Sequence, residues 1–274
     1  NKIYQGDYRT PEGIYFLTDF IPHSELIRRH GKRGEIYGVG AFVLNYPNPV
    51  DLQEGKTGGG IWLHSTNDET RIEKGLDSRG CIVTANQNLI EVSKYIELNK
   101  TMIVSVHNLK WLKKDTWMSK REKLLKTFSS WKNSWEKEDL SHYVSHYHKE
   151  KFKDPHRGRY SAFKKYKRAV FSQRGKPTVN VENLSILTTK NYAVMNFVQD
   201  YSSPTLKDIG RKTLYLQQDS FYKWKIVSEN WSKRGIEELE QKQEKMAFKP
   251  SLRFFKTIHP DQILGNSFNK KENN

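Results

Sequence analysis

The sequence has a single cysteine, few acidic residues relative to basic ones, and no long apolar run. Cys81 is the only cysteine, which excludes a disulfide within the chain. It is therefore either a small buried apolar side chain or a thiol kept for chemistry. No apolar stretch approaches the roughly 20 residues that cross a bilayer, and Asn1 opens without a signal-peptide core. We predict no membrane span, and the sequence stays compatible with an export signal removed from the mature protein.

The charge balance favours a polyanionic partner. Acidic residues number 31 against 47 basic ones, giving a net charge of +16, and such a field attracts nucleic acid, anionic lipid or anionic cell wall. The basic residues are spread from Lys2 to Lys271 and form no zinc pattern, RNA-recognition signature or compact basic helix. Nucleic acid is thus only the runner-up partner.

Length and patterning indicate two domains of the α+β class. A chain of 274 residues, 35% hydrophobic and 12% aromatic, is long enough for two packed cores. No internal repeat is present. The first hundred residues are predicted to form a small β-rich domain with one helix. Its expected strands are Gly13–Phe20, Glu35–Asn45, Ile61–His64 and Thr101–Val106, and its helix covers residues 86–98 with Asn86 as cap.

The second half begins with a long amphipathic helix from about Leu109 to Trp135, whose tryptophans we interpret as packing anchors between domains. Helical patterns continue over 140–152 and 160–171, and an antiparallel meander is expected after them. The charged helix Glu237–Lys245 and the polar tail read as an extension rather than a third core. The expected strands of the meander are Val179–Leu187, Tyr192–Tyr201, Lys212–Asp219 and Phe221–Trp231.

The chemistry-bearing stretch runs from residue 61 to 83. A strand delivers His64, and Cys81 follows 17 residues later behind Gly80. A neighbouring imidazole makes a thiol a competent nucleophile, and a glycine bend lets the amides of Gly80 and Cys81 point at one oxyanion. The tautomer of His64 needs a partner, for which the carbonyl or the hydroxyl of Ser65 is nearest. From chemistry alone, a catalytic and a buried structural thiol both stay open.

Two motifs resemble a known family. His64, the gap and Ser78-Arg79-Gly80-Cys81 resemble the signature of the YkuD L,D-transpeptidases, and Thr10-Pro11-Glu12-Gly13-Ile14-Tyr15 resembles the TPxGxY segment that precedes it there. The resemblance implies a YkuD catalytic domain over residues 1–110, lacking its first strands, with Cys81 as nucleophile and His64 as base. Two positions depart from the usual pattern, Arg79 where many members have His and Val83 where many have Arg. We assign Arg79, Ser78 and Trp62 to substrate binding.

The second half resembles another fold. Residues 139–233, ending in FYKWKIVSENW, are similar to a nuclear transport factor two-like domain, a cone of helices against a curved sheet. Residues 111–138 would connect the domains, and 234–274 would form a C-terminal extension. This layout is that of cell-shape peptidoglycan L,D-carboxypeptidases. Candidate pocket residues in the cone are Phe197, Tyr201 and Trp224, each with ordinary core packing as its alternative.

The resemblance implies a reaction. Cys81 would attack the L-centre carbonyl of meso-diaminopimelate in a tetrapeptide stem and release D-alanine, with no cofactor and no metal. An amine acceptor in place of water would make the enzyme an L,D-transpeptidase, and a non-catalytic wall-binding scaffold is the alternative of another class. The expected partner is peptidoglycan, without nucleic acid, and the expected location is the periplasm. His142, His146 and His148 are close in sequence, but we interpret them as a solvated helix face rather than a metal site.

Overall fold

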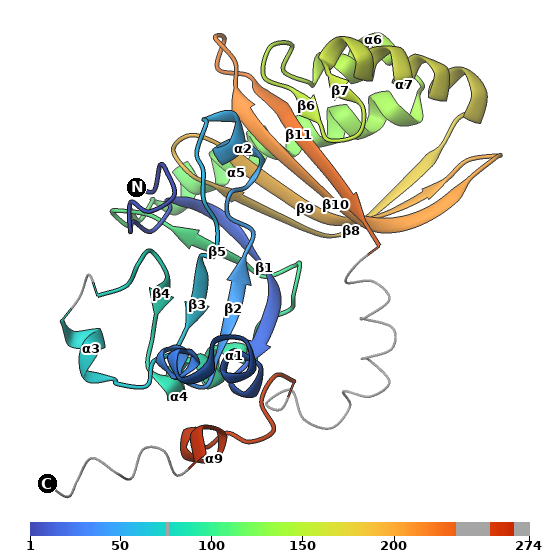
Figure 1. Ribbon diagram of the computed structural model, residues 1–274. Coiled ribbons are helices and arrows are strands. Elements are labelled where there is room, and N and C mark those ends of the chain that lie inside the picture. The colour runs from blue at the N-terminus through green and yellow to red at the C-terminus, as the bar shows by residue number, and fades with distance from the viewer. Residues whose placement is uncertain (75–76, 234–252, 266–274) are drawn as a thin grey trace, which may run out of the picture. The chain divides into compact units, whose positions relative to one another are not determined.

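The computed structural model describes residues 1–74, 77–233 and 253–265. The chain forms two compact units, one of residues 1–107 with 238–274 and the other of residues 108–237, each with its own hydrophobic core (Figure 1). Among the described residues, no helix combines the length and apolar character needed to cross a membrane. The helix expected at Glu237–Lys245 lies outside the described residues.

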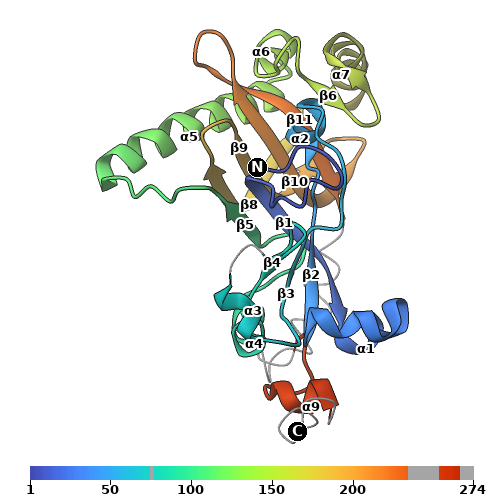
Figure 2. The ribbon, with the colours of Figure 1, turned by 60° about the vertical axis from the view of Figure 1, so that its left-hand side comes forward.

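The first unit is built on a five-stranded sheet in the order β4-β3-β2-β1-β5 (Figure 2). Neighbouring strands run antiparallel, except that β3 and β4 are parallel. Because these two short strands run in the same direction, the residues at which they begin lie at the same end of the sheet. The strands are β1 (Gly13–Pro22), β2 (Gly40–Leu44), β3 (Trp62–His64), β4 (Ile82–Val83) and β5 (Met102–Ser105).

The first unit holds more helices than the one that the sequence predicts, and α4 ends at Ser93 rather than at residue 98. The expected strand Glu35–Asn45 begins only at Gly40, because residues 31–37 form a 3₁₀ helix, η1 (Gly31–Tyr37). Gly34 allows this, since a Cβ there would overlap the backbone of Leu26 in the preceding helix. The helices are α1 (His23–His30), α2 (Pro49–Gln53), α3 (Thr70–Glu73), α4 (Asn86–Ser93) and α9 (Pro260–Leu264).

Residues 253–265 contribute to the core of the first unit. Phe255 is 4% exposed, and the rings of Phe254 and Phe255 each lie 5.1 Å from the ring of Phe20. Arg253 also donates to the Ile96 carbonyl at 2.6 Å. This part of the expected C-terminal extension therefore packs as core of the first unit.

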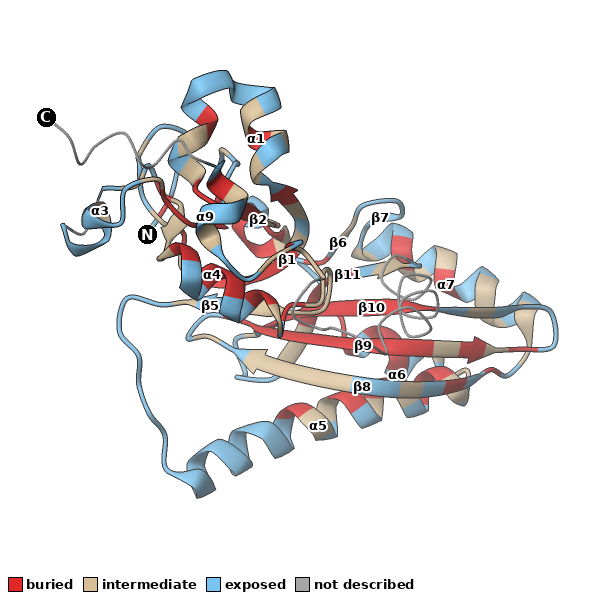
Figure 3. Cartoon of the chain, turned by 90° about the horizontal axis from the view of Figure 1, so that it is seen from below, coloured by how far each residue is buried: buried red, intermediate tan, exposed pale blue. Residues whose placement is uncertain are grey.

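The second unit packs three helices against an antiparallel four-stranded sheet in the order β11-β10-β9-β8, the meander that the sequence predicts. Figure 3 shows β9 and β10 as the most buried strands and the first turns of α5 as exposed. A small hairpin joins the helices. The elements are α5 (Lys114–Glu136), α6 (Leu140–Ser145), β6 (Lys153–Asp154), β7 (Gly158–Arg159), α7 (Tyr160–Arg174), β8 (Thr178–Thr188), β9 (Ala193–Ser202), β10 (Lys207–Gln218) and β11 (Trp224–Ser232).

Helix α6 is shorter than predicted. It ends at Ser145 rather than continuing to Phe152, because the chain then joins the edge of the sheet. The amide of Ile226 donates to the His146 carbonyl at 2.8 Å, and the amide of His148 donates to the Ile226 carbonyl at 2.9 Å. Backbone pairing with β11 thus replaces the helical hydrogen bonds that the apolar spacing favoured.

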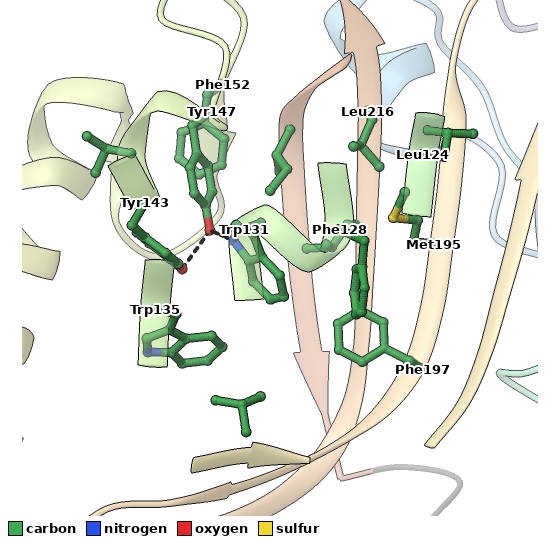
Figure 4. Close-up of a cluster of buried hydrophobic side chains, with 14 of the residues drawn as sticks. Leu124, Phe128, Trp131, Trp135, Tyr143, Tyr147, Phe152, Met195, Phe197 and Leu216 are labelled. Carbon is green, nitrogen blue, oxygen red and sulfur yellow. Dashed lines mark hydrogen bonds between the residues drawn. The ribbon is translucent and has the colours of Figure 1, made fainter. Parts of the chain in front are cut away.

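Aromatic side chains fill the core of the second unit (Figure 4). Trp131 and Trp135 of α5 are 1% and 6% exposed and pack within this unit. Phe197 and Tyr201 lie in the same core at 0% and 4% exposure, so they offer no surface to a ligand, and the pocket expected at these two positions is corrected to core packing. Trp224 is half-buried and lies at the margin of the cluster.

Candidate active site

The segment before β1 is fixed by one buried ion pair. Asp7 accepts hydrogen bonds from the amides of Ile3, at 2.6 Å, and Arg9, at 3.1 Å, and from Lys2 Nζ at 2.8 Å. Burial alone would raise the pKa of Asp7, but these bonds outweigh it and hold the pKa well below its usual range. The segment is therefore held in one conformation, with the Ile3 carbonyl accepting from the Thr57 amide at 3.0 Å.

Gly80 ties this segment to the nucleophile turn. Its φ of +105° lies in the region that favours glycine, and a Cβ would stand 2.6 Å from the Arg9 carbonyl oxygen. Ser78 Oγ donates to the Cys81 carbonyl at 2.7 Å and accepts from the Gly80 amide at 3.3 Å. The turn is closed by Ser78, so in this structure the Gly80 amide is engaged within it.

The Cys81 thiol is half-buried, between two backbone groups at the start of β3. Sγ donates to the Gly60 carbonyl oxygen at 3.6 Å. Burial raises the pKa of the thiol, while a hydrogen bond from the Trp62 amide and the charge of Lys2 oppose the shift. The resting group is therefore a neutral thiol that needs a base to become a nucleophile.

His64 lies at the end of β3 and is 7% exposed. Its ring has the tautomer that such a base needs. Its Nδ1 lies 2.5 Å from the Ser65 carbonyl oxygen, and because a carbonyl only accepts, Nδ1 carries the proton and Nε2 the lone pair. Burial lowers the pKa of His64, the Ser65 bond opposes this, and the charge of Arg71 lowers it further. Of the two Ser65 groups considered from sequence, the carbonyl is the one in contact.

Strand register brings the thiol and the imidazole to one face. In the parallel pair, Leu63 lies opposite Ile82 and His64 opposite Val83, which puts Cys81 level with Trp62. Residues directly opposite each other on paired strands lie on the same face of the sheet, as do residues two apart in one strand. Cys81, Trp62 and His64 therefore point to the same side. From strand rise and spacing, the Cα atoms of Cys81 and His64 are about 8 Å apart, within side-chain reach.

Tyr37 joins this cluster and was missed by sequence reasoning. Its ring stands edge-on to His64 at 5.0 Å and lies 5.0 Å from the Trp62 ring. Burial raises the pKa of Tyr37, the charge of Cys81 raises it further, and the charge of Arg79 lowers it. The one available signal was Gly38 after it, whose φ of +56° marks the turn that aims this ring.

Ser65 contacts both His64 and Tyr37. Its side chain is fully buried, accepts from the Val39 amide at 2.8 Å and donates to the Tyr37 carbonyl at 3.3 Å. Asn86 accepts from the same Val39 amide at 3.2 Å and donates to the Thr66 carbonyl at 2.8 Å. Asn86 is therefore the first residue of α4 rather than its cap, because its side chain is used to fix this loop.

The predicted substrate-binding residues lie around the turn. Arg79 is exposed, with its guanidinium 5.8 Å from the centre of the Tyr8 ring. Trp62 is half-buried beside Tyr37, and Ser78 serves the turn itself. Arg71 is bound to Asp77 at 2.6 Å, whereas Arg79, two residues before Cys81, is exposed. A positive charge at that place suits a ligand carboxylate.

Comparisons with known proteins decide the family. Residues 3–105 match the L,D-transpeptidase catalytic domain, YkuD, and residues 123–230 match the Cds6 C-terminal NTF2-like domain. The structure of Bd1075 from Bdellovibrio bacteriovorus is 31% identical, with a TM-score of 0.70 and coverage of 82% of this chain and 78% of that one. The chain belongs to the YkuD L,D-transpeptidase family. The expected fold, a YkuD domain followed by an NTF2-like domain, is confirmed.

A second relative of this YkuD protein has a described role. The helical cell shape determining protein Pgp2 from Campylobacter jejuni is 28% identical, with a TM-score of 0.62 and coverage of 84% of this chain and 78% of that one. No curated protein sequence matches the chain.

Of the three histidines predicted to lie on a solvated face, His142 is exposed and His148 half-buried, but His146 is buried. His146 is 8% exposed rather than solvated, because its Nε2 and that of His142 both contact Ser130 Oγ, at 3.0 and 2.9 Å. In the described part of this YkuD-family chain, no group of three or more His, Cys, Asp or Glu side chains is arranged to hold a metal ion.

Proposed function

We propose that this protein is a periplasmic peptidoglycan L,D-carboxypeptidase that influences cell shape. The observation that carries the proposal is the strand register, which places the half-buried Cys81 thiol on the same sheet face as His64, whose Nδ1 contacts the Ser65 carbonyl. Membership of the L,D-transpeptidase family supports peptidoglycan as the substrate. The resemblance to a helical cell shape determining protein supports the cellular role.

The proposed chemistry begins with proton transfer from Cys81 Sγ to His64 Nε2. The thiolate attacks the L-centre carbonyl of meso-diaminopimelate, and amides of the glycine turn stabilise the oxyanion. Because the Gly80 amide contacts Ser78 Oγ at 3.3 Å, a weak bond, its use requires a small rotation of that hydroxyl or leaves the Cys81 amide as donor. The amine of D-alanine takes the proton back from His64 and leaves, and a thioester remains.

The acceptor that resolves the thioester decides which activity the enzyme has. Water, deprotonated by His64, would hydrolyse the thioester to a tripeptide and restore the thiol. An amine from another stem would instead form a cross-link, the alternative L,D-transpeptidase activity. We favour hydrolysis because the match to the helical cell shape determining protein covers 84% of this chain, and the two-domain layout resembles that of cell-shape L,D-carboxypeptidases. Arg79, exposed beside the turn, would bind a stem carboxylate.

The test is incubation of purified muropeptides with the protein and with Cys81→Ala, followed by mass spectrometry. We expect the protein to convert tetrapeptides to tripeptides with release of D-alanine, and Cys81→Ala to lose at least about a thousandfold in rate, as when other nucleophiles are removed. Cross-linked products would identify the transpeptidase. Unchanged muropeptides, with the protein folded, would contradict both enzymes and support a scaffold.

A further inference from the structure

Tyr8 has a backbone conformation that tyrosine rarely adopts. Its φ is +54°, in the left-handed region that favours glycine and, among the other residues, asparagine. A bulky side chain is strained in this region, and such strain persists only where the surrounding structure imposes it. The conformation of Tyr8 therefore needs a cause in its neighbours.

The residues on either side of Tyr8 are both held in place. The Asp7 carboxylate before it accepts hydrogen bonds from Lys2 Nζ at 2.8 Å and from the Arg9 amide at 3.1 Å. The carbonyl of Arg9 after it lies so close to Gly80 that a Cβ on that glycine would stand 2.6 Å from its oxygen. Tyr8 is thus fixed between a buried carboxylate and the turn that carries the thiol.

The ring of Tyr8 contacts a charged side chain at the surface. The ring is 62% exposed, so it adds little to the core. The guanidinium carbon of Arg79 lies 5.8 Å from the ring centre, within the range at which a cation is attracted to the face of an aromatic ring. Arg79 is exposed and enters no ion pair among the described residues. Its one aromatic contact is therefore supplied by a strained residue of the fixed first segment.

We propose that Tyr8 is a positioning residue, whose ring holds the Arg79 guanidinium at the turn Ser78–Cys81 to bind a carboxylate of the stem peptide. The choice of substrate rests on the proposed function. An exposed arginine samples several rotamers, and a bound carboxylate must select one of them. A ring that already holds the side chain reduces this cost. A guanidinium that lies on a ring through its flat face keeps its edge free for two parallel hydrogen bonds to a carboxylate.

This role predicts an effect on substrate recognition rather than on the chemical step. The ring of Tyr8 acts through Arg79, so its loss should raise KM more than it lowers kcat. An amidated stem offers no charge-assisted pair to the guanidinium. The amidated stem should therefore be insensitive to the residue at position 8.

The experiment compares Tyr8→Asn and Tyr8→Phe in the full chain, with Tyr4→Asn as the matched control. Asn adopts positive φ more readily than Tyr, so Tyr8→Asn removes the ring without adding strain, whereas Tyr8→Phe keeps the ring. Tyr4 belongs to the same segment, is 61% exposed and enters no ring contact among the described residues. Tyr8→Asn should melt at or above the temperature of the unmutated chain. A lower Tm would overturn the proposal, because the ring would then serve folding.

Kinetics with a tetrapeptide muropeptide test the effect on the substrate. We expect Tyr8→Asn to raise KM roughly two- to fivefold, as for the loss of an exposed cation–π contact, and Tyr8→Phe and Tyr4→Asn to stay within about 1.5-fold. In an Arg79→Gln background, Tyr8→Asn should have no further effect, because the two residues act as one unit. An equal effect in that background, on the amidated stem or in Tyr4→Asn would overturn the proposal.

Proton NMR of the Arg79 side chain tests the contact without turnover. The face of a ring shifts the Arg79 Cδ protons upfield, and this shift should vanish in Tyr8→Asn and persist in Tyr8→Phe. Adding a disaccharide tripeptide to the Cys81→Ala chain should move the same resonances, and less so in Tyr8→Asn. A missing ring shift, or resonances that the tripeptide leaves in place, would overturn the positioning role even in an active enzyme. Failure of the proposed function is read separately, from unchanged muropeptides with the unmutated chain.

Discussion

The thiol and imidazole of the YkuD unit differ from the buried Tyr147 of the NTF2-like unit in their hydrogen-bond partners. In the YkuD unit, the Cys81 thiol is half-buried and His64 Nε2 has no hydrogen-bond partner among the described residues. In the NTF2-like unit, Tyr147 accepts from Trp131 at 3.1 Å and donates to Glu229 at 2.8 Å, deep in the core. An unsatisfied group beside a surface is available to a substrate, whereas a satisfied buried group specifies packing. The contrast places the candidate reacting groups in the YkuD unit, whereas Tyr147 and Glu229 stabilise the core of the NTF2-like unit.

The buried charges of the NTF2-like unit depend on one carboxylate. Glu229 accepts from Lys212 at 3.1 Å, and both side chains are 7% exposed. Lys167 lies over the rings of Trp135 and Tyr143 at 5.0 and 5.2 Å. Burial lowers the pKa of Lys167 to about 8, with Glu229 opposing the shift. Burial would raise the pKa of Glu229, but Lys212 and Lys167 outweigh it and lower it.

Removing that carboxylate should give the largest effect on stability. Glu229→Ala leaves two buried ammonium groups without their counter-charge, which costs about 3–5 kcal/mol when a buried pair is broken. Denaturant unfolding measures the loss, and Glu182→Ala, an exposed carboxylate on β8, is the control, with a change within about 0.5 kcal/mol. Alkylation of Cys81 should keep its rate in the folded variant. A changed alkylation rate would show that the loss of Glu229 in one unit affects the Cys81 environment in the other.

Gly80→Ala tests the same contrast from the catalytic side. The substitution combines positive-φ strain with overlap of the Arg9 carbonyl, and we expect about 3 kcal/mol of destabilisation together with loss of activity. Gly6→Ala is the matched control, because Gly6 has φ +90° but no atom within 4 Å of the added Cβ. It should cost about 1 kcal/mol, the strain alone. Equal effects of the two variants would remove the steric link between the first segment and the nucleophile turn.

Sequence alone singled out the proposed reacting pair, Cys81 and His64, but not the aromatic residue beside His64. Cys81 and His64 could be singled out because a glycine turn and a strand end are local signals. Tyr37 could not, because the stretch before it reads as strand, whereas close packing at Gly34 makes it a 3₁₀ helix that aims the ring at His64. A residue brought to a site by tertiary packing leaves no periodic trace in the chain.

In the NTF2-like unit, sequence analysis predicted a pocket where the structure has packed core. Phe197 and Tyr201 carry the residue types of a ligand pocket, but alternation along a strand only assigns a face and does not tell whether that face is filled. The rings of Phe128 and Trp135 fill it, at 5.0 Å from Phe197 and 5.5 Å from Tyr201. Whether a cavity remains depends on side chains from α5, far away in sequence.

The pH dependence of thiol alkylation should sharpen the contrast further. Only the thiolate reacts, and burial raises the pKa of Cys81 above its ordinary value of 9.0. The rate with iodoacetamide should therefore be slow at neutral pH and still rise above pH 9. Since the chain has one cysteine, mass spectrometry follows this site alone, with a short cysteine peptide as reference. A rate that levels off near neutral pH would indicate a preformed thiolate–imidazolium pair instead.

The smallest expected effect concerns Tyr37, which we interpret as a positioning residue for His64. Its ring covers the imidazole edge-on, and aromatic contacts of this kind contribute about 0.5–1.5 kcal/mol. Tyr37→Ala should lower kcat/KM roughly three- to tenfold. Burial is the main cause of the lowered pKa of His64. Removing the Tyr37 ring exposes the imidazole, which should raise that pKa and move the acid limb of the kcat/KM profile to higher pH. Tyr37→Phe keeps the ring and should leave both unchanged, and a loss as large as that of Tyr37→Ala would assign the role to the hydroxyl.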